Sequence, residues 1–308
     1  MATIEARERG RADAASTSGS TASGRARAID FCVFVDNAHG EAFERSGFAE
    51  RLRSDPALDS MARHRQVKKE ISEAYGALAQ CRRAMRERGI DVHGSGRGVT
   101  FVELCSGRGF VSLVLVDAFP ESKVRMIDND TKMNVSHVER FCDPDQMSFH
   151  VMDVRSEECE KFVVDACESE GAECVVLVGV HLCGDLSHRA IEIYERVPGV
   201  AALVLSPCCL PRRRRHDAFG FHCKDIARSM SMSPYQCWTT QLYLRIPQDG
   251  SKRDMIVDDD VLSQQNAFLI ARRPLNEPSL ETLSLSSKLG CRVVAGRSRA
   301  KWRVVRDA

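Results

Sequence analysis

The chain has 308 residues, enough for one large domain or two small ones, and its 43% hydrophobic and 28% charged residues are ordinary for a globular protein. A formal net charge of +1 excludes a polycation, so any surface that binds nucleic acid must be local. No apolar stretch reaches the roughly 18 residues that a membrane-spanning helix needs, so we expect no membrane partner. The 13 irregularly spaced cysteines favour a reducing intracellular compartment, cytoplasmic, nuclear or organellar, over a disulfide framework.

The N-terminal third divides into two parts. Residues 1–30 have almost no large apolar side chains, which predicts a disordered tail. The tail is rich in arginine, but its acidic residues argue against an organelle transit peptide. Residues 31–97 predict a helical extension, in which apolar side chains recur at three- and four-residue steps on one stripe: Val67, Ile71, Tyr75, Leu78 and Cys81.

Apolar runs alternate with amphipathic segments from residue 98 to residue 273. The runs at 99–105, 124–128, 147–153, 173–180 and 201–207 predict strands, and the segments at 109–118, 131–141, 156–170 and 186–196 predict helices. This alternation predicts an α/β domain with a mostly parallel, doubly wound, Rossmann-like sheet. Residues 266–272 predict an antiparallel edge strand, and residues 274–308 predict a linker followed by a basic tail.

The first strand of this domain leads into a glycine turn. Glu103 ends the apolar run, and Gly107 and Gly109 follow, where the missing Cβ atoms allow a nucleotide to approach the backbone. The second strand ends at Asp128. Its distance in sequence from Glu103 is close to the roughly 20 residues at which an acid hydrogen-bonds to the ribose diol of a bound nucleotide. Ser112 stands where a dinucleotide-binding turn has its third glycine, and Glu103 suits a ligand with a cationic end. The alternative is a strand-to-helix corner that binds nothing.

This segment resembles motif I of the class I S-adenosylmethionine-dependent methyltransferases. Cys105 stands where that family usually has glycine. The resemblance implies the class I methyltransferase fold and S-adenosylmethionine as cofactor. The third predicted strand ends at an acid that could accept a hydrogen bond from the adenine amino group or, alternatively, cap the following helix. The implied cofactor-binding residues are Glu103, Cys105, Gly107, Gly109, Asp128 and Asp153.

The ends of the fourth and fifth strands narrow the resemblance. The sequences His181-Leu-Cys-Gly184 and Cys208-Cys209 resemble a group that contains the eukaryotic tRNA 2′-O-methyltransferases and the methyltransferase-like-25-type proteins. This likeness covers roughly residues 68–272 and implies a pocket at the methyl-transfer end lined by His181, Cys183, Gly184, Asp185, Cys208 and Cys209. Two features depart from the tRNA enzymes: Val180 replaces a lysine, and the N-terminal zinc modules are missing.

The strand-end side chains allow several roles. A histidine titrates near neutrality, so His181 is the natural general base, and Asp185 could orient it or act as the base itself. Alternatively, His181 closes the turn by bonding to backbone. A zinc site from His181, Cys183, Cys208 and Cys209, with His216, His222 and Cys223 near them in sequence, is a rival. Because adjacent cysteines rarely ligate one ion, we favour thiols that line the pocket and no metal.

Two basic segments point to the substrate. The run Arg212, Arg213, Arg214 and Arg215 directly follows the predicted site and would attract a phosphate backbone, although a solvated loop or a sorting signal is the alternative. The basic C-terminal segment around Trp302 could grip phosphates and stack a base, or form a solvated hairpin or tail. We therefore predict an RNA methyltransferase, with tRNA favoured. A protein or small-molecule methyltransferase, a non-catalytic binding protein and a dehydrogenase are the alternatives.

Overall fold

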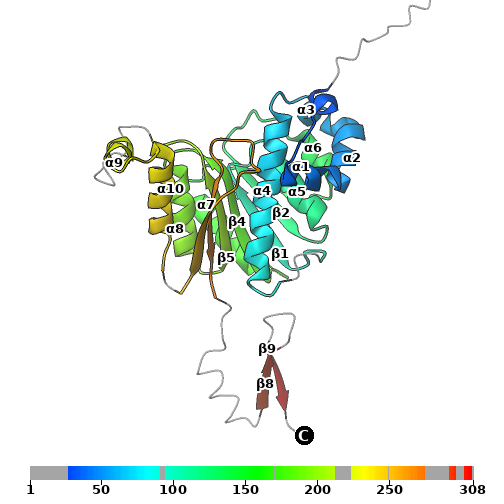
Figure 1. The fold of residues 1–308 in the computed structure, drawn as a ribbon. Helices are drawn as coiled ribbons and strands as arrows, with labels where there is room; N and C mark the ends of the chain where they lie inside the picture. Colours follow the sequence, from blue (N-terminus) through cyan, green and yellow to red (C-terminus); the bar gives the residue numbers. More distant parts are fainter. Residues whose placement is uncertain are drawn as a thin grey trace, which may run out of the picture.

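The computed structural model describes residues 27–90, 94–169, 171–211, 223–248 and 250–274, and the backbone of residues 291–295 and 302–306. Its larger sheet has seven strands in the order β3-β2-β1-β4-β5-β7-β6, with helices on both faces (Figure 1). The strands are β1 (Val99–Leu104), β2 (Lys123–Asp128), β3 (Met147–Val151), β4 (Cys174–Leu182), β5 (Val200–Pro207), β6 (Lys252–Val257) and β7 (Ala267–Arg272). The predicted α/β, Rossmann-like fold is confirmed.

Pairing in the sheet is parallel from β3 through β5. β1 pairs in parallel with both β2 and β4, and β7 runs antiparallel to both β5 and β6. The antiparallel strand predicted at 266–272 is thus β7, one position in from the edge, and β6, which we did not predict, forms the edge itself. Since β1, β2, β4 and β5 run in one direction, their carboxyl ends meet at one edge of the sheet, where ligands bind in open α/β sheets.

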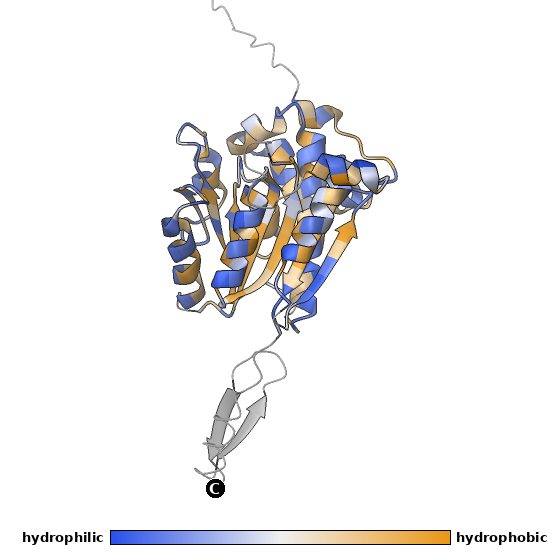
Figure 2. Cartoon of the chain, turned by 90° about the vertical axis from the view of Figure 1, so that its left-hand side faces the viewer, coloured by the Kyte–Doolittle hydropathy of each residue, from blue (hydrophilic) through white to orange (hydrophobic). Residues whose placement is uncertain are grey.

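The two faces of the sheet bury separate apolar cores. Side chains along a strand point alternately to opposite faces, so Phe101 joins one core and Val102 the other. Figure 2 shows apolar strands lying between helices whose outer surfaces are polar. The first core includes α1 (Ala38–Glu44), α2 (Gly47–Ser54), α3 (Asp59–Ala62), α4 (Val67–Arg86), α5 (Phe110–Ala118) and α6 (Ser136–Phe141). The second includes α7 (Glu157–Glu168), α8 (Leu186–Arg196), α9 (Cys223–Ser229) and α10 (Pro234–Arg245).

Helix α4 is the element of the predicted helical extension that reaches the sheet. It packs along α5 and against β4, β5 and β7 (Figure 1). The approach is close at Gly76, where an added Cβ would lie 2.8 Å from Cγ2 of Val261 and 3.1 Å from the ring of Phe268. Almost the whole central part of α4 is therefore buried, including polar side chains such as Glu73. This placement brings polar residues of α4 to the ends of the parallel strands.

Several predicted features lie partly or wholly outside the described residues. These are most of the tail predicted at residues 1–30, the four arginines Arg212–Arg215, and the linker that begins at residue 274. Within the predicted basic tail, β8 (Cys291–Ala295) and β9 (Trp302–Arg306) pair antiparallel in a separate two-stranded sheet. Among the described helices, none is long and apolar enough to cross a membrane. The cysteines whose side chains are described are free thiols.

Candidate active site

The turn from β1 to α5 contains three residues in the left-handed region of backbone space. Cys105, Gly107 and Gly109 have φ angles of 55°, 53° and 80°. A Cβ added to Gly109 would lie 2.5 Å from Cε of Met126, whereas a Cβ added to Gly107 would have no atom within 4 Å. The space beside Gly107 is therefore open to a ligand, as the glycine pattern predicts. Cys105 stands in place of the usual glycine, and because it has a Cβ the left-handed conformation destabilises the fold there by about 1–2 kcal/mol.

Two predicted acids hold this turn from either side. Glu103 is 3% exposed, and its carboxyl group accepts a hydrogen bond from the backbone nitrogen of Ser112 at 3.1 Å and another from the Ser112 hydroxyl. Burial raises the pKa of Glu103 to about 8, although the bonds from Ser112 lower it. Asp128, at the end of β2, accepts from the backbone nitrogens of Gly107 and Asp130, both at 3.0 Å. Asp128 thus links the turn to the second strand.

A cavity of about 260 Å³ lies beside the turn, slightly below the roughly 300–1,000 Å³ of small-molecule sites. Its walls include the predicted cofactor residues Glu103, Cys105, Gly107 and Gly109, and His181 from the end of β4. Two further carboxyl groups, Glu70 and Glu73 of α4, line it as well, together with His64 and Arg108. Of these, Glu73 has a lowered pKa, and a carboxylate in the wall of a small cavity favours a ligand that carries positive charge. Asp128 and Asp153 lie outside this lining.

His181 contacts two charged side chains of α4 that the sequence analysis did not identify. Its Nε2 lies 2.5 Å from Oε1 of Glu73 and 3.1 Å from Nζ of Lys69, and the same Nζ lies 2.7 Å from Oε1 of Glu73. Lys69 and Glu73 are four residues apart on α4 and therefore share a helix face. Burial acts to raise the pKa of Glu73, but the hydrogen bonds and charges of His181 and Lys69 outweigh it and lower the pKa. Glu73 is therefore ionised at neutral pH.

Asp185 and Asp153 are both engaged by Arg155. The guanidinium of Arg155 donates to Asp185 from Nη2 at 2.9 Å and from Nε at 3.3 Å. The backbone nitrogen of Arg155 donates to Asp153 at 2.9 Å. Helix α7 is capped by Ser156, so the alternative role of Asp153 as a helix cap is wrong. The carboxylate in contact with the His181 ring is Glu73, which occupies the place that we had expected for Asp185.

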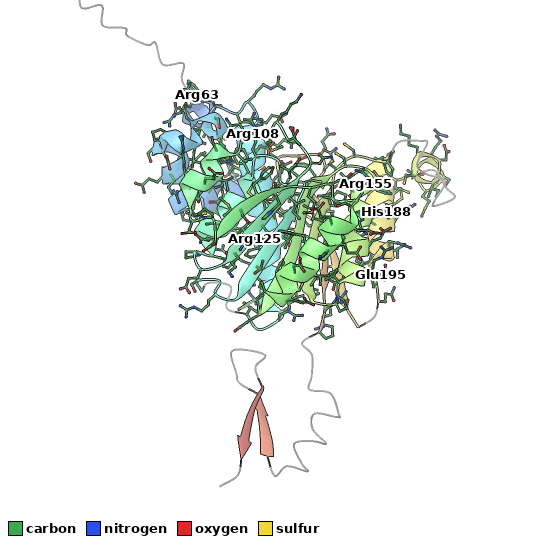
Figure 3. All side chains as sticks on the ribbon, turned by 180° about the vertical axis from the view of Figure 1, so that it is seen from behind. Arg63, Arg108, Arg125, Arg155, His188 and Glu195 are labelled. Atoms are coloured by element: carbon green, nitrogen blue, oxygen red, sulfur yellow. The ribbon has the colours of Figure 1, made fainter. Side chains whose placement is uncertain are left out.

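Figure 3 shows where Arg108, Arg125 and Arg155 lie relative to the sheet. Arg155 and Arg108 lie toward the upper end of the view, where the parallel strands finish, and Arg125 lies lower on β2. Arg108 belongs to the glycine turn and lines the cavity, whereas Arg155 follows β3. The turn after β1 and the segment after β3 therefore lie at the same edge of the sheet.

The three cysteines predicted to line the pocket lie together. Sγ of Cys208 is 2.9 Å from Sγ of Cys183 and 3.5 Å from Sγ of Cys209, and all three sulfurs lie within 4.8 Å of one another. Cys208 also donates a hydrogen bond to the backbone carbonyl of His181 at 3.3 Å. Cys223 is buried in the second core, and His216 and His222 lie outside the described residues. The structure thus brings together three of the sulfurs and turns the ring of His181 toward Glu73.

Comparisons with known proteins identify the domain. Residues 66–213 match a family model described as a methyltransferase domain. No curated protein matches the sequence significantly.

Solved structures resemble this chain at low identity. The fibrillarin pre-rRNA processing protein of Methanococcus jannaschii has 11% identity and a TM-score of 0.37, over 62% of this chain and 73% of that chain. The plantazolicin methyltransferase BpumL in complex with SAH has 11% identity and a TM-score of 0.39, over 76% and 97%. An O-methyltransferase family protein of Burkholderia thailandensis has 15% identity and a TM-score of 0.36, over 73% and 67%. Similarity this low has no bearing on the substrate.

The matched segment contains the parts of the site described above. It begins just before α4, which carries Lys69 and Glu73, and it extends past the end of β5 with its paired cysteines. The glycine turn, the acid that ends β2 and the histidine that ends β4 all lie within it. Residues 66–213 are therefore a methyltransferase domain, and the chain is an S-adenosylmethionine-dependent methyltransferase with the strand order β3-β2-β1-β4-β5-β7-β6.

Proposed function

We propose that this enzyme methylates RNA, with tRNA favoured, and that His181 accepts the proton of the methylated group. The observation that carries the proposal is the contact of His181 with Glu73 in the wall of the cavity, where Lys69 contacts both side chains from outside the lining. The glycine turn lines the same cavity. A base held by charged partners and a cofactor-type turn therefore share one small volume, as methyl transfer requires.

The residues present fit S-adenosylmethionine. Gly107 leaves open space beside the turn, and the carboxyl groups in the cavity wall suit a ligand with an ammonium and a sulfonium group. We assign Glu103 to the amino-acid end, Asp128 to the ribose and Asp153 to the adenine, as the motif predicts. The cofactor, when bound, supplies an electrophilic methyl group.

The proton chemistry follows from the partners of His181. Both Glu73 and Lys69 face Nε2, but the ionised carboxylate is the nearer, at 2.5 Å against 3.1 Å for the ammonium. Glu73 therefore favours the tautomer with the proton on Nε2, which leaves Nδ1 able to accept a proton. When Nδ1 takes the proton of the acceptor group, the carboxylate stabilises the imidazolium that forms. Lys69 donates to the second oxygen of Glu73 at 2.9 Å and so fixes the carboxylate. Glu73 and Lys69 are therefore positioning residues.

Two features support RNA as the substrate. The His181–Gly184 and Cys208–Cys209 sequences resemble those of the tRNA 2′-O-methyltransferases. Those enzymes carry a lysine where this chain has Val180, and here Lys69 brings an ammonium to 3.1 Å from His181. Four arginines directly follow Pro211, which is close to Gly184: an added Cβ on Gly184 would lie 3.4 Å from Cα of Pro211. A run of guanidinium groups attracts phosphates through counterion release.

The test is methyl transfer from radiolabelled S-adenosylmethionine into a cell extract depleted of small molecules, followed by separate nuclease and protease digestion. We expect label that nuclease removes, and loss of that label with His181→Asn, because asparagine tolerates the φ of 60° at this position. Asp128→Ala serves as the cofactor-binding control. Label that only protease removes, or label recovered only in an added small molecule, would contradict RNA as the substrate.

The arginine run has a separate test. Replacing Arg212–Arg215 with alanine should flatten the dependence of RNA affinity on salt concentration, because fewer counterions are released on binding. RNA binding is measured by filter retention or fluorescence anisotropy at several salt concentrations. A matched variant with four arginines of the N-terminal segment replaced by alanine, Arg45, Arg53, Arg63 and Arg65, controls for the loss of positive charge. An unchanged slope would remove the run from the RNA-binding surface.

A further inference from the structure

Three thiols gather at the carboxyl ends of β4 and β5, outside the lining of the cavity. The Sγ atoms of Cys183 and Cys208 are 2.9 Å apart, those of Cys208 and Cys209 are 3.5 Å apart, and all three fall within 4.8 Å. Cys183 and Cys209 are exposed and Cys208 is half-buried. The cluster is therefore compact and reachable from solvent.

The backbone holds these sulfurs in place. β4 and β5 are parallel neighbours, and their register pairs Leu182 with Pro207, so Cys183 and Cys208 are the next residues across a gap of about 4.8 Å. Directly beyond, the backbone nitrogen of Gly184 donates to the carbonyl of Cys209 at 2.9 Å. The three cysteines are thus fixed by two adjoining strand ends rather than by the conformations of their own side chains.

The cluster is unfavourable for ionised thiols on their own. The three sulfurs lie within 4.8 Å of one another, so thiolates at these positions would repel each other. A cation among the sulfurs reverses this effect, because it stabilises each thiolate directly. Repulsion therefore destabilises the cluster when several of the thiols are ionised, whereas a positive ion bound among the sulfurs stabilises it.

We propose that Cys183, Cys208 and Cys209 bind a thiophilic metal ion of the Zn²⁺ type. Sulfur donors select soft or borderline ions, and three protein ligands leave a fourth tetrahedral position for water or another ligand. On binding, three S–H bonds are replaced by three bonds from sulfur to the metal, and the protons pass to solvent. The sequence argued against a shared ion because Cys208 and Cys209 are adjacent, but their sulfurs lie only 3.5 Å apart and both are within 4.8 Å of that of Cys183.

Such an ion would tie together the strand ends that flank the catalytic histidine. Cys208 already contacts the carbonyl of His181, and Cys183 lies two residues after it. Cys209 is followed two residues later by Pro211, and the arginine run begins at the next residue, Arg212. A metal bound here would join the end of β4, which carries the proposed base, to the segment that we assign to RNA.

The test uses the full chain, stripped of metal, fully reduced and kept under anaerobic conditions, with Co²⁺ as a spectroscopic substitute for Zn²⁺. We expect one Co²⁺ per chain, thiolate charge-transfer bands in the near ultraviolet and visible bands typical of tetrahedral cobalt. Zn²⁺ should displace the Co²⁺ and abolish these bands. The readout is independent of methyl transfer, so failure of the RNA proposal would not affect it.

Variants locate the ion. Cys208→Ser and Cys183→Ser should each weaken Co²⁺ binding by more than roughly 10–100-fold, the cost of losing a group that only hydrogen-bonds to a metal ligand. Cys209→Ser, at an exposed position, provides a second variant if those two fold poorly, and Cys32→Ser, at a half-buried thiol outside the cluster, is the matched control. Absence of the thiolate bands, or their persistence in Cys208→Ser, would overturn the proposal. Equal rates of alkylation at the three cysteines with and without Zn²⁺ would also overturn it.

Discussion

Replacing Glu73 with glutamine tests the contact on which the proposed mechanism depends. The side chain of Glu73 is 4% exposed, and its carboxylate lies 2.5 Å from Nε2 of His181 and 2.7 Å from Nζ of Lys69. Glutamine keeps the size of the side chain but removes the charge. We therefore expect Glu73→Gln to destabilise the fold at neutral pH, because two donors lose their ionised acceptor.

The size of the effect follows from the exposure of the partners. A hydrogen bond to a charged group contributes about 1.5–3 kcal/mol, and breaking a fully buried ion pair costs about 3–5 kcal/mol. The side chains of Lys69 and His181 remain 29% and 28% exposed, so water partly replaces the lost acceptor. We therefore expect a loss of about 2 kcal/mol in the free energy of unfolding, toward the lower of these two ranges.

The lowered pKa of Glu73 also predicts how the loss of stability should change with pH. The pKa of Glu73 is lowered from its usual value of 4.5, so its contribution to stability is present above about pH 4.5 and is lost as the pH falls through the folded-state pKa. Urea unfolding of both proteins, followed by circular dichroism, should show a difference at pH 7 that shrinks in acid. Glu70→Gln, the same change elsewhere in the cavity wall, is the control. A difference independent of pH, or none at pH 7, would refute the reasoning.

Three further predictions concern the cofactor side of the cavity. Asp128→Ala should weaken binding of S-adenosylhomocysteine by about 1–3 kcal/mol in calorimetry, and unchanged affinity would remove the ribose assignment. Gly107→Ala and Gly109→Ala should each lose about 1–2 kcal/mol of stability to left-handed strain, but Gly107→Ala should lose more affinity, because its Cβ points into open space and that of Gly109 meets Met126. Burial raises the pKa of Glu103 to about 8, so its stabilising neutral form is lost as the pH rises from about 5 toward 8. The melting temperature of Glu103→Gln should therefore rise relative to that of the natural protein as the pH increases over this range. A difference in melting temperature that does not change with pH would contradict the raised pKa of Glu103.

The strands that carry the site could be predicted because their side chains repeat with a clear pattern. β1 and β5 are buried at every position, so continuous apolar runs mark them, and their ends agree with prediction to within one residue. β6 differs: it forms the edge, has only half-buried and exposed positions and begins with charged residues. An edge strand of this kind has no apolar run and therefore could not be predicted from the pattern of apolar residues.

Helix α10 could have been predicted from signals at its start. Ser233 caps the helix, Pro234 occupies its first turn, and Gln236 completes a capping box with Ser233. Its apolar positions are less regular than those of α8, because polar side chains interrupt the apolar positions along its length. The end signals were thus more informative here than the periodicity on which we relied.

The partners of His181 could not be predicted in the same way, because they come from a helix far away in the sequence. Glu73 and Lys69 look like solvated polar positions opposite the apolar stripe of α4, since charged side chains are rarely buried unless paired. In the structure, α4 packs between α5 and the strand ends, and the pair faces the histidine of a strand more than a hundred residues later. Burial of the acid is favourable only because His181 and Lys69 together offset its desolvation. Without these two partners, burial would raise the pKa of Glu73 instead of leaving it lowered, so the proposed base depends on all three residues being present.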